Sequence, residues 1–124
     1  VDTGYYDRAD DDLIIIVQIE TPQAVENVKE IAAVDGVDVV FVGPRDMSAA
    51  LGKLNKFDDP ELRALIATVE QATLASGKAL GTVAPTAAQV RDLFGRGYTF
   101  LIAGSDVSHL RAGITQMMKD AGHR

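Results

Sequence analysis

The sequence predicts an α/β fold made of four consecutive β/α units with parallel strands. Three observations support this: four short apolar runs, a helix-spaced apolar pattern after each run, and glycine or proline at the boundaries. Strands that alternate with helices pair in parallel, because each helix crosses back over the sheet. A closed eight-stranded TIM barrel takes about 250 residues. The 124 residues are therefore enough for half a barrel, and an open four-stranded sheet is the alternative.

The first two units are predicted over residues 13–51. Residues 13–20 are the first strand, and its apolar start (13–17) is typical of a strand buried on both faces. Thr21 and Pro22 are typical of a helix start, and Gly36 marks its end. Residues 37–43 form the second strand, and a short helix follows over about 46–51.

The last two units follow a polar loop. Asp58 or Asp59 caps a helix that ends at Gly77, and residues 79–84 are the third strand, whose glycine indicates close neighbours. Thr86 caps the next helix, residues 99–103 are the fourth strand, and 104–106 form a turn. Residues 108–121 are a final amphipathic helix. We expect residues 1–12 to be an entry segment and 13–124 to be the half-barrel domain.

Composition excludes several classes of function. A net charge of −6 argues against binding to nucleic acid, which needs clustered Lys and Arg. The longest apolar run has the length of a strand, so no membrane partner is expected. The chain has no cysteine and no export signal at its start, which is compatible with a reducing cytosol. We therefore expect a cytoplasmic protein.

Polar residues at two strand ends are the candidates for chemistry. Period-two alternation places Gln18 and Glu20 on one face of the first strand, at the end where parallel α/β folds bind ligands. Asp46 follows the second strand after the turn at Gly43 and Pro44. Considered alone, Glu20 has a second interpretation, as a polar residue at a strand end. Asp46 considered alone also has one, as a simple helix N-cap, with Ser48 completing the turn.

Together the two carboxylates predict a site for a divalent metal. Adjacent parallel strands direct Glu20 and Asp46 to the same edge of the sheet. Mg²⁺ and Mn²⁺ favour oxygen ligands, and Mg²⁺ often takes one or two carboxylates with water and substrate. The sequence lacks the His and Cys spacings of a structural zinc site.

These motifs resemble the second half of the HpcH/HpaI family of class II pyruvate aldolases. The resemblance rests on residues 18–21, 24–27, 36–38, 41–48 and 51–52, and continues weakly to the turn at 104–106. The separation of 26 positions between Glu20 and Asp46 is that of the family's metal ligands. The resemblance implies half of a TIM barrel in a metal-dependent aldolase, which cleaves a 4-hydroxy-2-oxo acid into pyruvate and an aldehyde.

The resemblance also implies roles for single residues. Glu20 and Asp46 would hold Mg²⁺ or Mn²⁺, with Co²⁺ as a further possibility, and the metal would polarise the keto oxygen of the substrate. Gln18 and the backbone at Arg45 and Asp46 would bind the pyruvate-like part. The family's catalytic His and substrate-binding Arg belong to the first half of the barrel, so the fragment alone is expected to be inactive.

The remaining expectations concern the tail and the assembly. His109 and His123 do not match the catalytic His, and we interpret both as surface or helix-end residues. The resemblance implies a homo-oligomer in which the final helix packs on a neighbouring subunit. The alternative is a non-catalytic α/β module that binds a metal or an oxyacid and assembles with itself or another chain.

Overall fold

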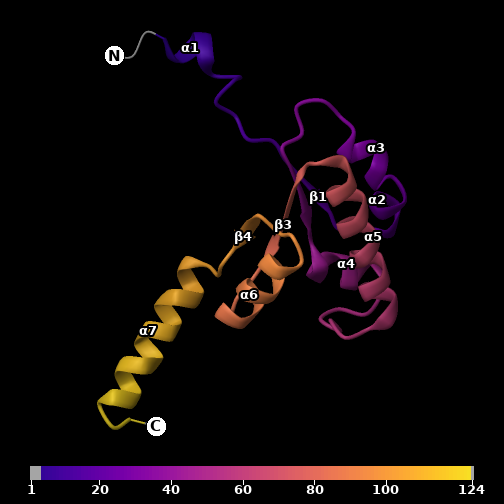
Figure 1. Ribbon diagram of the computed structural model, residues 1–124. Coiled ribbons are helices and arrows are strands. Elements are labelled where there is room, and N and C mark those ends of the chain that lie inside the picture. The colour runs from indigo at the N-terminus through magenta and orange to yellow at the C-terminus, as the bar shows by residue number, and fades with distance from the viewer. Residues whose placement is uncertain (1–3, 124) are drawn as a thin grey trace.

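The computed structural model describes residues 4–123 and has one sheet of four parallel strands at its centre (Figure 1). Each strand pairs with its neighbour in the sequence, so the order is β1-β2-β3-β4. This confirms the predicted parallel sheet and its order. The bounds are β1 (Ile16–Ile19), β2 (Val39–Val42), β3 (Ala79–Val83) and β4 (Phe100–Ile102).

The helices that lie between consecutive strands in the chain cover one face of the sheet (Figure 1). The bounds are α1 (Tyr5–Arg8), α2 (Pro22–Glu26), α3 (Val28–Ala32), α4 (Pro44–Ala50), α5 (Pro60–Ser76), α6 (Ala87–Gly95) and α7 (Asp106–Asp120). Helix α5 contacts α2, α3, α4, β2 and β3. It is therefore the central helix of the covered face (Figure 1).

The core lies between the sheet and these helices. Alternate strand residues face it, and Ile19, Val40 and Leu80 are each at most 1% exposed. Helices α3 and α5 contribute Val28 and Leu62, which are equally buried. Burial of such side chains stabilises the fold by about 1.5–3 kcal/mol each.

Side chains at strand ends and helix starts explain the helix boundaries. The Thr21 hydroxyl accepts from the backbone N–H of Ala24, and the Thr86 hydroxyl from that of Gln89. Helix α5 begins at the N-cap Asp59 and ends at Gly77, whose φ of +76° suits glycine. These caps lie at the positions that the sequence predicts.

Three local predictions need correction. Strand β1 begins at Ile16, and Leu13 and Ile14 are 62% and 67% exposed, so burial on both faces is wrong for this stretch. The reason is that β1 pairs with β2 alone and is an edge of the sheet. The predicted helix after Pro22 is two helices, because the Asn27 amide donates to the carbonyl of Gln23 and competes with the helix ladder.

The third correction concerns the start of α7. The predicted turn at 104–106 already contains its first residue, Asp106, and Ser105 is the N-cap. The hydroxyl groups of Ser105 and Ser108 exchange hydrogen bonds with each other's backbone N–H groups. This capping box extends the helix two residues beyond its predicted start.

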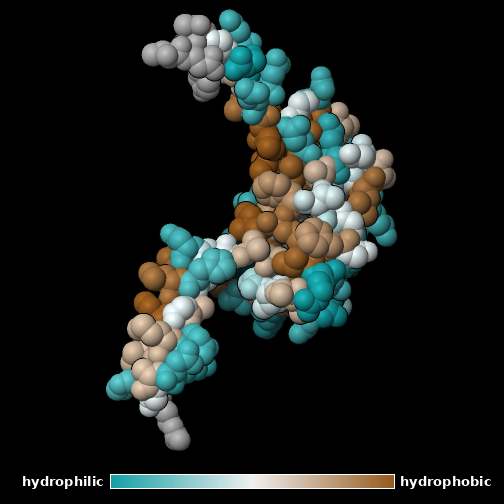
Figure 2. Space-filling model, turned by 60° about the vertical axis from the view of Figure 1, so that its left-hand side comes forward, coloured by the Kyte–Doolittle hydropathy of each residue, from teal (hydrophilic) through white to brown (hydrophobic). Residues whose placement is uncertain are grey.

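Helix α7 extends away from the sheet (Figure 1). None of its residues is buried, although it carries an apolar stripe that consists of Val107, Leu110, Ile114, Met117 and Met118. In the space-filling view, hydrophobic residues line the inner side of a crescent-shaped molecule and occur again on helix α7 (Figure 2). No helix within residues 4–123 is long and apolar enough to cross a membrane.

Candidate functional site

A cavity of about 600 Å³ opens where the carboxyl ends of the strands meet. It lies on the face of the sheet that the core helices leave uncovered. Each strand contributes to it: Gln18 from β1, Phe41 from β2, Val83 from β3 and Ile102 from β4. Its remaining lining residues follow the strands and are Gly43, Pro44, Arg45, Asp46, Pro85, Gly104, Ser105 and Ser108.

The wall of this cavity depends on a glycine in β3. A methyl group on Gly81 would lie 2.8 Å from Cδ2 of Phe41 and 3.1 Å from the carbonyl oxygen of Phe100. The two phenyl rings pack edge to face, with centroids 6.3 Å apart. The predicted close approach at the glycine of the third strand is therefore confirmed.

Gln18 and Glu20 extend from the same face at the end of β1, as period-two alternation predicts. Gln18 Nε2 donates a 2.6 Å hydrogen bond to Glu20 Oε2, while Ile19 between them is buried in the core. Gln18 lines the cavity; Glu20 does not line it and lies at its margin, half-buried. The hydrogen bond between Gln18 and Glu20 thus fixes these two polar side chains relative to each other.

Gly43 brings the end of β2 close to this pair. A methyl group on Gly43 would lie 2.7 Å from Gln18 Nε2 and 3.1 Å from Glu20 Cβ. The backbone of Gly43 has φ −101°, which any residue adopts, so the glycine provides space and not an unusual conformation. Sequence reasoning treated Gly43 only as a turn residue, and the register of two strands was needed to place it beside Gln18.

Arg45 and Asp46 lie in the first turn of α4 and both line the cavity. The N-cap of α4 is Gly43, so the interpretation of Asp46 as an N-cap is wrong. Among residues 4–123, none makes a hydrogen bond or ion pair with the Asp46 carboxylate. The same part of the chain offers no acceptor to the backbone N–H groups of Arg45 and Asp46. These groups are therefore open to a ligand.

Ser48 has a structural role instead of completing a cap. Its hydroxyl is fully buried, donates to the carbonyl of Arg45 and accepts from the backbone N–H of Asn55. Lys53 in the same loop pairs with Asp59 at 2.9 Å and Glu61 at 2.8 Å. Hydrogen bonding to Glu61 and Asp59 raises the pKa of Lys53, and the bond from Lys53 lowers the pKa of Asp59. The loop is thus fastened to both helices that it connects.

The junction of β4 and α7 forms the remaining wall. Sequence reasoning missed Ser105 and Ser108 here; the Gly-Ser-Asp turn at a strand end was the signal that could have found them. His109 is exposed, and a ring nitrogen lies 3.2 Å from the carbonyl oxygen of Ala103. Neither His109 nor His123 lines the cavity, in agreement with their interpretation as surface residues.

The donor set fits a hard divalent cation held by few protein ligands. Glu20 and Asp46 offer carboxylate oxygens, which Mg²⁺ and Mn²⁺ prefer. Within residues 4–123, no group of three or more His, Cys, Asp or Glu side chains is placed to hold a metal ion. A site of two carboxylates completed by water and substrate is compatible with the residues present.

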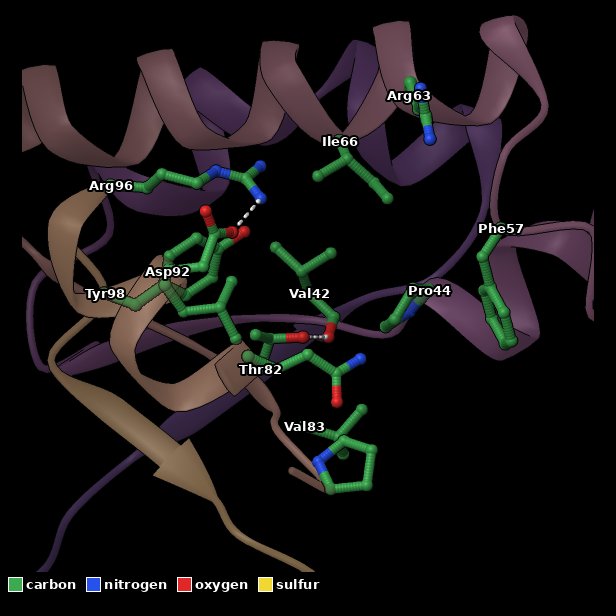
Figure 3. A pocket seen from close by; sticks show the side chains of 13 residues that line it. Val42, Pro44, Phe57, Arg63, Ile66, Thr82, Val83, Asp92, Arg96 and Tyr98 are labelled. Atoms are coloured by element: carbon green, nitrogen blue, oxygen red, sulfur yellow. Dashed lines mark hydrogen bonds and ion pairs between the residues drawn. The ribbon is translucent and has the colours of Figure 1, made fainter. Parts of the chain in front are cut away.

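A second cavity, of about 530 Å³, lies between α5 and α6 on the other side of the sheet (Figure 3). Thr82 there donates a 3.0 Å hydrogen bond to the carbonyl of Val42. Arg96 faces Asp92 in Figure 3 and also pairs with Glu70. Because its charges are already paired within the chain, this cavity lacks the open carboxylate and N–H groups of the first.

Comparison with known families matches most of the chain. Residues 3–112 match the family model described as HpcH/HpaI aldolase/citrate lyase. A 5-keto-4-deoxy-D-glucarate aldolase from Citrobacter koseri is 41% identical over 94% of this chain and 45% of its own length. A hydroxypyruvate/pyruvate aldolase from Cupriavidus necator is 42% identical over 85% of this chain and 39% of its own. The chain therefore spans less than half of the length of these relatives.

Solved structures agree with the sequence comparison. An HpcH/HpaI aldolase/citrate lyase family protein from Burkholderia cenocepacia has a TM-score of 0.88 and 34% identity, over 96% of this chain and 46% of its own. Macrophomate synthase, at 24% identity, shares the fold with a TM-score of 0.82, over 98% of this chain and 43% of its own. The predicted four β/α units, corresponding to half of a TIM barrel, are thereby confirmed.

Proposed function

The chain belongs to the HpcH/HpaI aldolase/citrate lyase family, and on that premise we propose that it supplies the metal-binding half of an aldolase site. The complete protein would cleave a 4-hydroxy-2-oxo acid into pyruvate and an aldehyde. Aldolase relatives that match nearly all of this chain support the reaction class. Residues 13–124 would form the half-barrel domain, preceded by the entry segment 1–12.

One observation carries the proposal: Gln18 and Asp46, from different β/α units, line one cavity at the carboxyl ends of the strands. Glu20 adjoins it through its hydrogen bond to Gln18. This is the face where TIM-barrel enzymes have their active sites. Mg²⁺, Mn²⁺ or Co²⁺ would be held by Glu20 and Asp46 and, when bound, would supply Lewis-acid polarisation of the keto group.

The other groups of the cavity would bind the keto-acid part of the substrate. The open backbone N–H groups of Arg45 and Asp46 suit the carboxylate of the substrate. Gln18 would form a hydrogen bond with the keto acid as donor or acceptor. Phe41 and Ile102 would form an apolar wall beside the reacting carbons. These residues orient the substrate but offer no base.

Aldol cleavage needs a base to take the proton from the 4-hydroxyl group. The C3–C4 bond then breaks, the aldehyde leaves, and C3 receives a proton to give pyruvate. The described residues that line the cavity include no His or Lys. We propose that the base, and the substrate-binding arginine that the family resemblance implies, lie in the barrel half outside this chain.

We further propose that the complete protein is a homo-oligomer in which α7 packs on a neighbouring subunit. The apolar stripe of α7 supports this, since Leu110 is 66% exposed and Met117 is 61% exposed. An exposed apolar stripe at helical spacing is typical of a helix that packs against a partner.

The proposal is tested by pyruvate release from 4-hydroxy-2-oxo acids of graded length. The complete protein is assayed after chelation and after addition of Mg²⁺, Mn²⁺ or Co²⁺. We expect turnover to disappear on chelation and to return with metal. Full turnover after chelation would contradict the metal role, and intact metal binding without pyruvate release would favour the non-catalytic module.

A further inference from the structure

The contact between Gln18 and Glu20 constrains how Glu20 can bind a cation. Gln18 Nε2 donates to Glu20 Oε2 at 2.6 Å, a short bond of the kind that charged acceptors make. An oxygen that already accepts such a bond is a weaker metal ligand than a free one. Oε1 is therefore the oxygen of Glu20 that is disposed to coordinate.

Gly43 leaves space for the Gln18 amide beside the end of β2. The built methyl position on Gly43 lies 2.7 Å from Gln18 Nε2, which is closer than two such atoms can approach. A side chain at Gly43 would push the amide away from Glu20. The absence of a side chain at Gly43 thus permits the hydrogen bond between Gln18 in β1 and Glu20, the residue that follows β1.

We propose that Gln18 is a positioning residue that holds Glu20 for coordination through one oxygen, with Gly43 providing the space. The inference rests on the proposed metal site and adds a basis for its cation preference. Mg²⁺ and Mn²⁺ sites accept single carboxylate oxygens in octahedral geometry, whereas Ca²⁺ takes six to eight oxygens and often both of one carboxylate. The Gln18 amide therefore favours the smaller cations over Ca²⁺.

The test measures cation binding and not turnover. Mn²⁺ is titrated into the complete protein by electron paramagnetic resonance, and Ca²⁺ is then added as competitor. Gln18→Met keeps the volume of the side chain but loses the hydrogen-bond donor. We expect about tenfold weaker Mn²⁺ binding, as is found for other residues that hydrogen-bond to metal ligands. The preference for Mn²⁺ over Ca²⁺ should also become smaller. The matched control Gln71→Met alters an exposed glutamine on α5 and is expected to change neither value.

A double-mutant cycle separates this role from damage to the fold. Gly43→Ala alone is expected to weaken Mn²⁺ binding as Gln18→Met does, because the new methyl group displaces the amide. In a Gln18→Ala background the amide is gone, so Gly43→Ala should weaken Mn²⁺ binding clearly less than it does in the wild-type background. Unchanged Mn²⁺ affinity and unchanged Ca²⁺ competition in Gln18→Met, with binding lost in Glu20→Gln, would overturn the inference and leave the proposed function intact. Unchanged Mn²⁺ binding in Glu20→Gln would overturn both.

Discussion

The phenol of Tyr98 donates a 2.6 Å hydrogen bond to Glu70 Oε1 and so connects the segment before β4 to α5. Tyr98 is 2% exposed, and the guanidinium of Arg96 pairs with Glu70 and lies 5.8 Å from the centre of the tyrosine ring. Burial first, and then the bond to Glu70, raise the pKa of Tyr98 above its ordinary value of 10.0. The folded chain therefore holds this proton more tightly than the unfolded chain does.

Tyr98→Phe is expected to lower the free energy of unfolding by about 1–2 kcal/mol at neutral pH, since a buried bond to a carboxylate is lost. Urea denaturation of the complete protein measures this change. Glu70→Gln is a useful companion, because it keeps an acceptor for Tyr98 but removes the ion pair with Arg96.

The raised pKa of Tyr98 also predicts a sensitivity to alkali. Below its ordinary value of 10.0 the phenol is protonated in both states, and its contribution to stability is fully present. Above that value only the unfolded chain releases the proton, so rising pH favours unfolding. The stability difference between wild type and Tyr98→Phe should be constant up to about pH 10 and should shrink from about pH 10 to about pH 11. A constant difference across that range would contradict this account of Tyr98.

Gly81→Ala is expected to destabilise the protein by about 1–3 kcal/mol, because the added methyl group overlaps the Phe41 ring and the carbonyl of Phe100. Gly113→Ala in α7 is the matched control: a methyl group there has no neighbour within 4 Å. We expect little change or a small gain in the control. Equal effects of the two substitutions in thermal denaturation would be inconsistent with the packing described at Gly81.

Acid sensitivity is expected at the loop between α4 and α5. The bond from Lys53 lowers the pKa of Asp59 from its ordinary 3.8. This carboxylate therefore contributes stability above that value, and the contribution is lost as pH falls through the lowered pKa. Thermal melting of Asp59→Asn and wild type should converge as the pH is lowered below about 4. A gap that stays constant down to the lowest pH would argue against this role of the Lys53–Asp59 pair.

The isolated 124-residue chain is expected to associate and to lack aldolase turnover. Its first strand is an open edge, and the exposed Leu13 and Ile14 lie next to it. Such surfaces drive association. Light scattering beside a pyruvate-release assay with Mn²⁺ measures both properties. A stable 13.2 kDa monomer would contradict the first expectation, and turnover by the isolated chain would contradict the second.

Most of the fold could be predicted because its signals are local. Apolar runs gave the strands, and capping residues such as Thr21, Asp59 and Thr86 gave the helix starts. Burial of Leu13 and Ile14 was predicted wrongly, because an apolar run does not reveal whether a neighbouring strand covers it. The boundary of α7 depended on a Ser105–Ser108 capping box, which has serine where the usual pattern has glutamate.

The candidate site was predictable in part. Alternation placed Gln18 and Glu20 on one face, and the strand-end position of Asp46 brought it to the same edge. The space at Gly43 and the cavity wall at Ser108 depend on the register between strands and on the direction in which α7 leaves β4. Neither follows from the residues of one element.

The central claim is that Glu20 and Asp46 together hold a divalent cation, and Mn²⁺ titration of the complete protein tests it most directly. Glu20→Gln and Asp46→Asn are each expected to weaken Mn²⁺ binding by at least about tenfold, since each loses a charged ligand. Circular dichroism and thermal melting should show a retained fold, and the metal-free variants could gain stability where two carboxylates no longer repel each other. Wild-type Mn²⁺ affinity in either variant would contradict the claim.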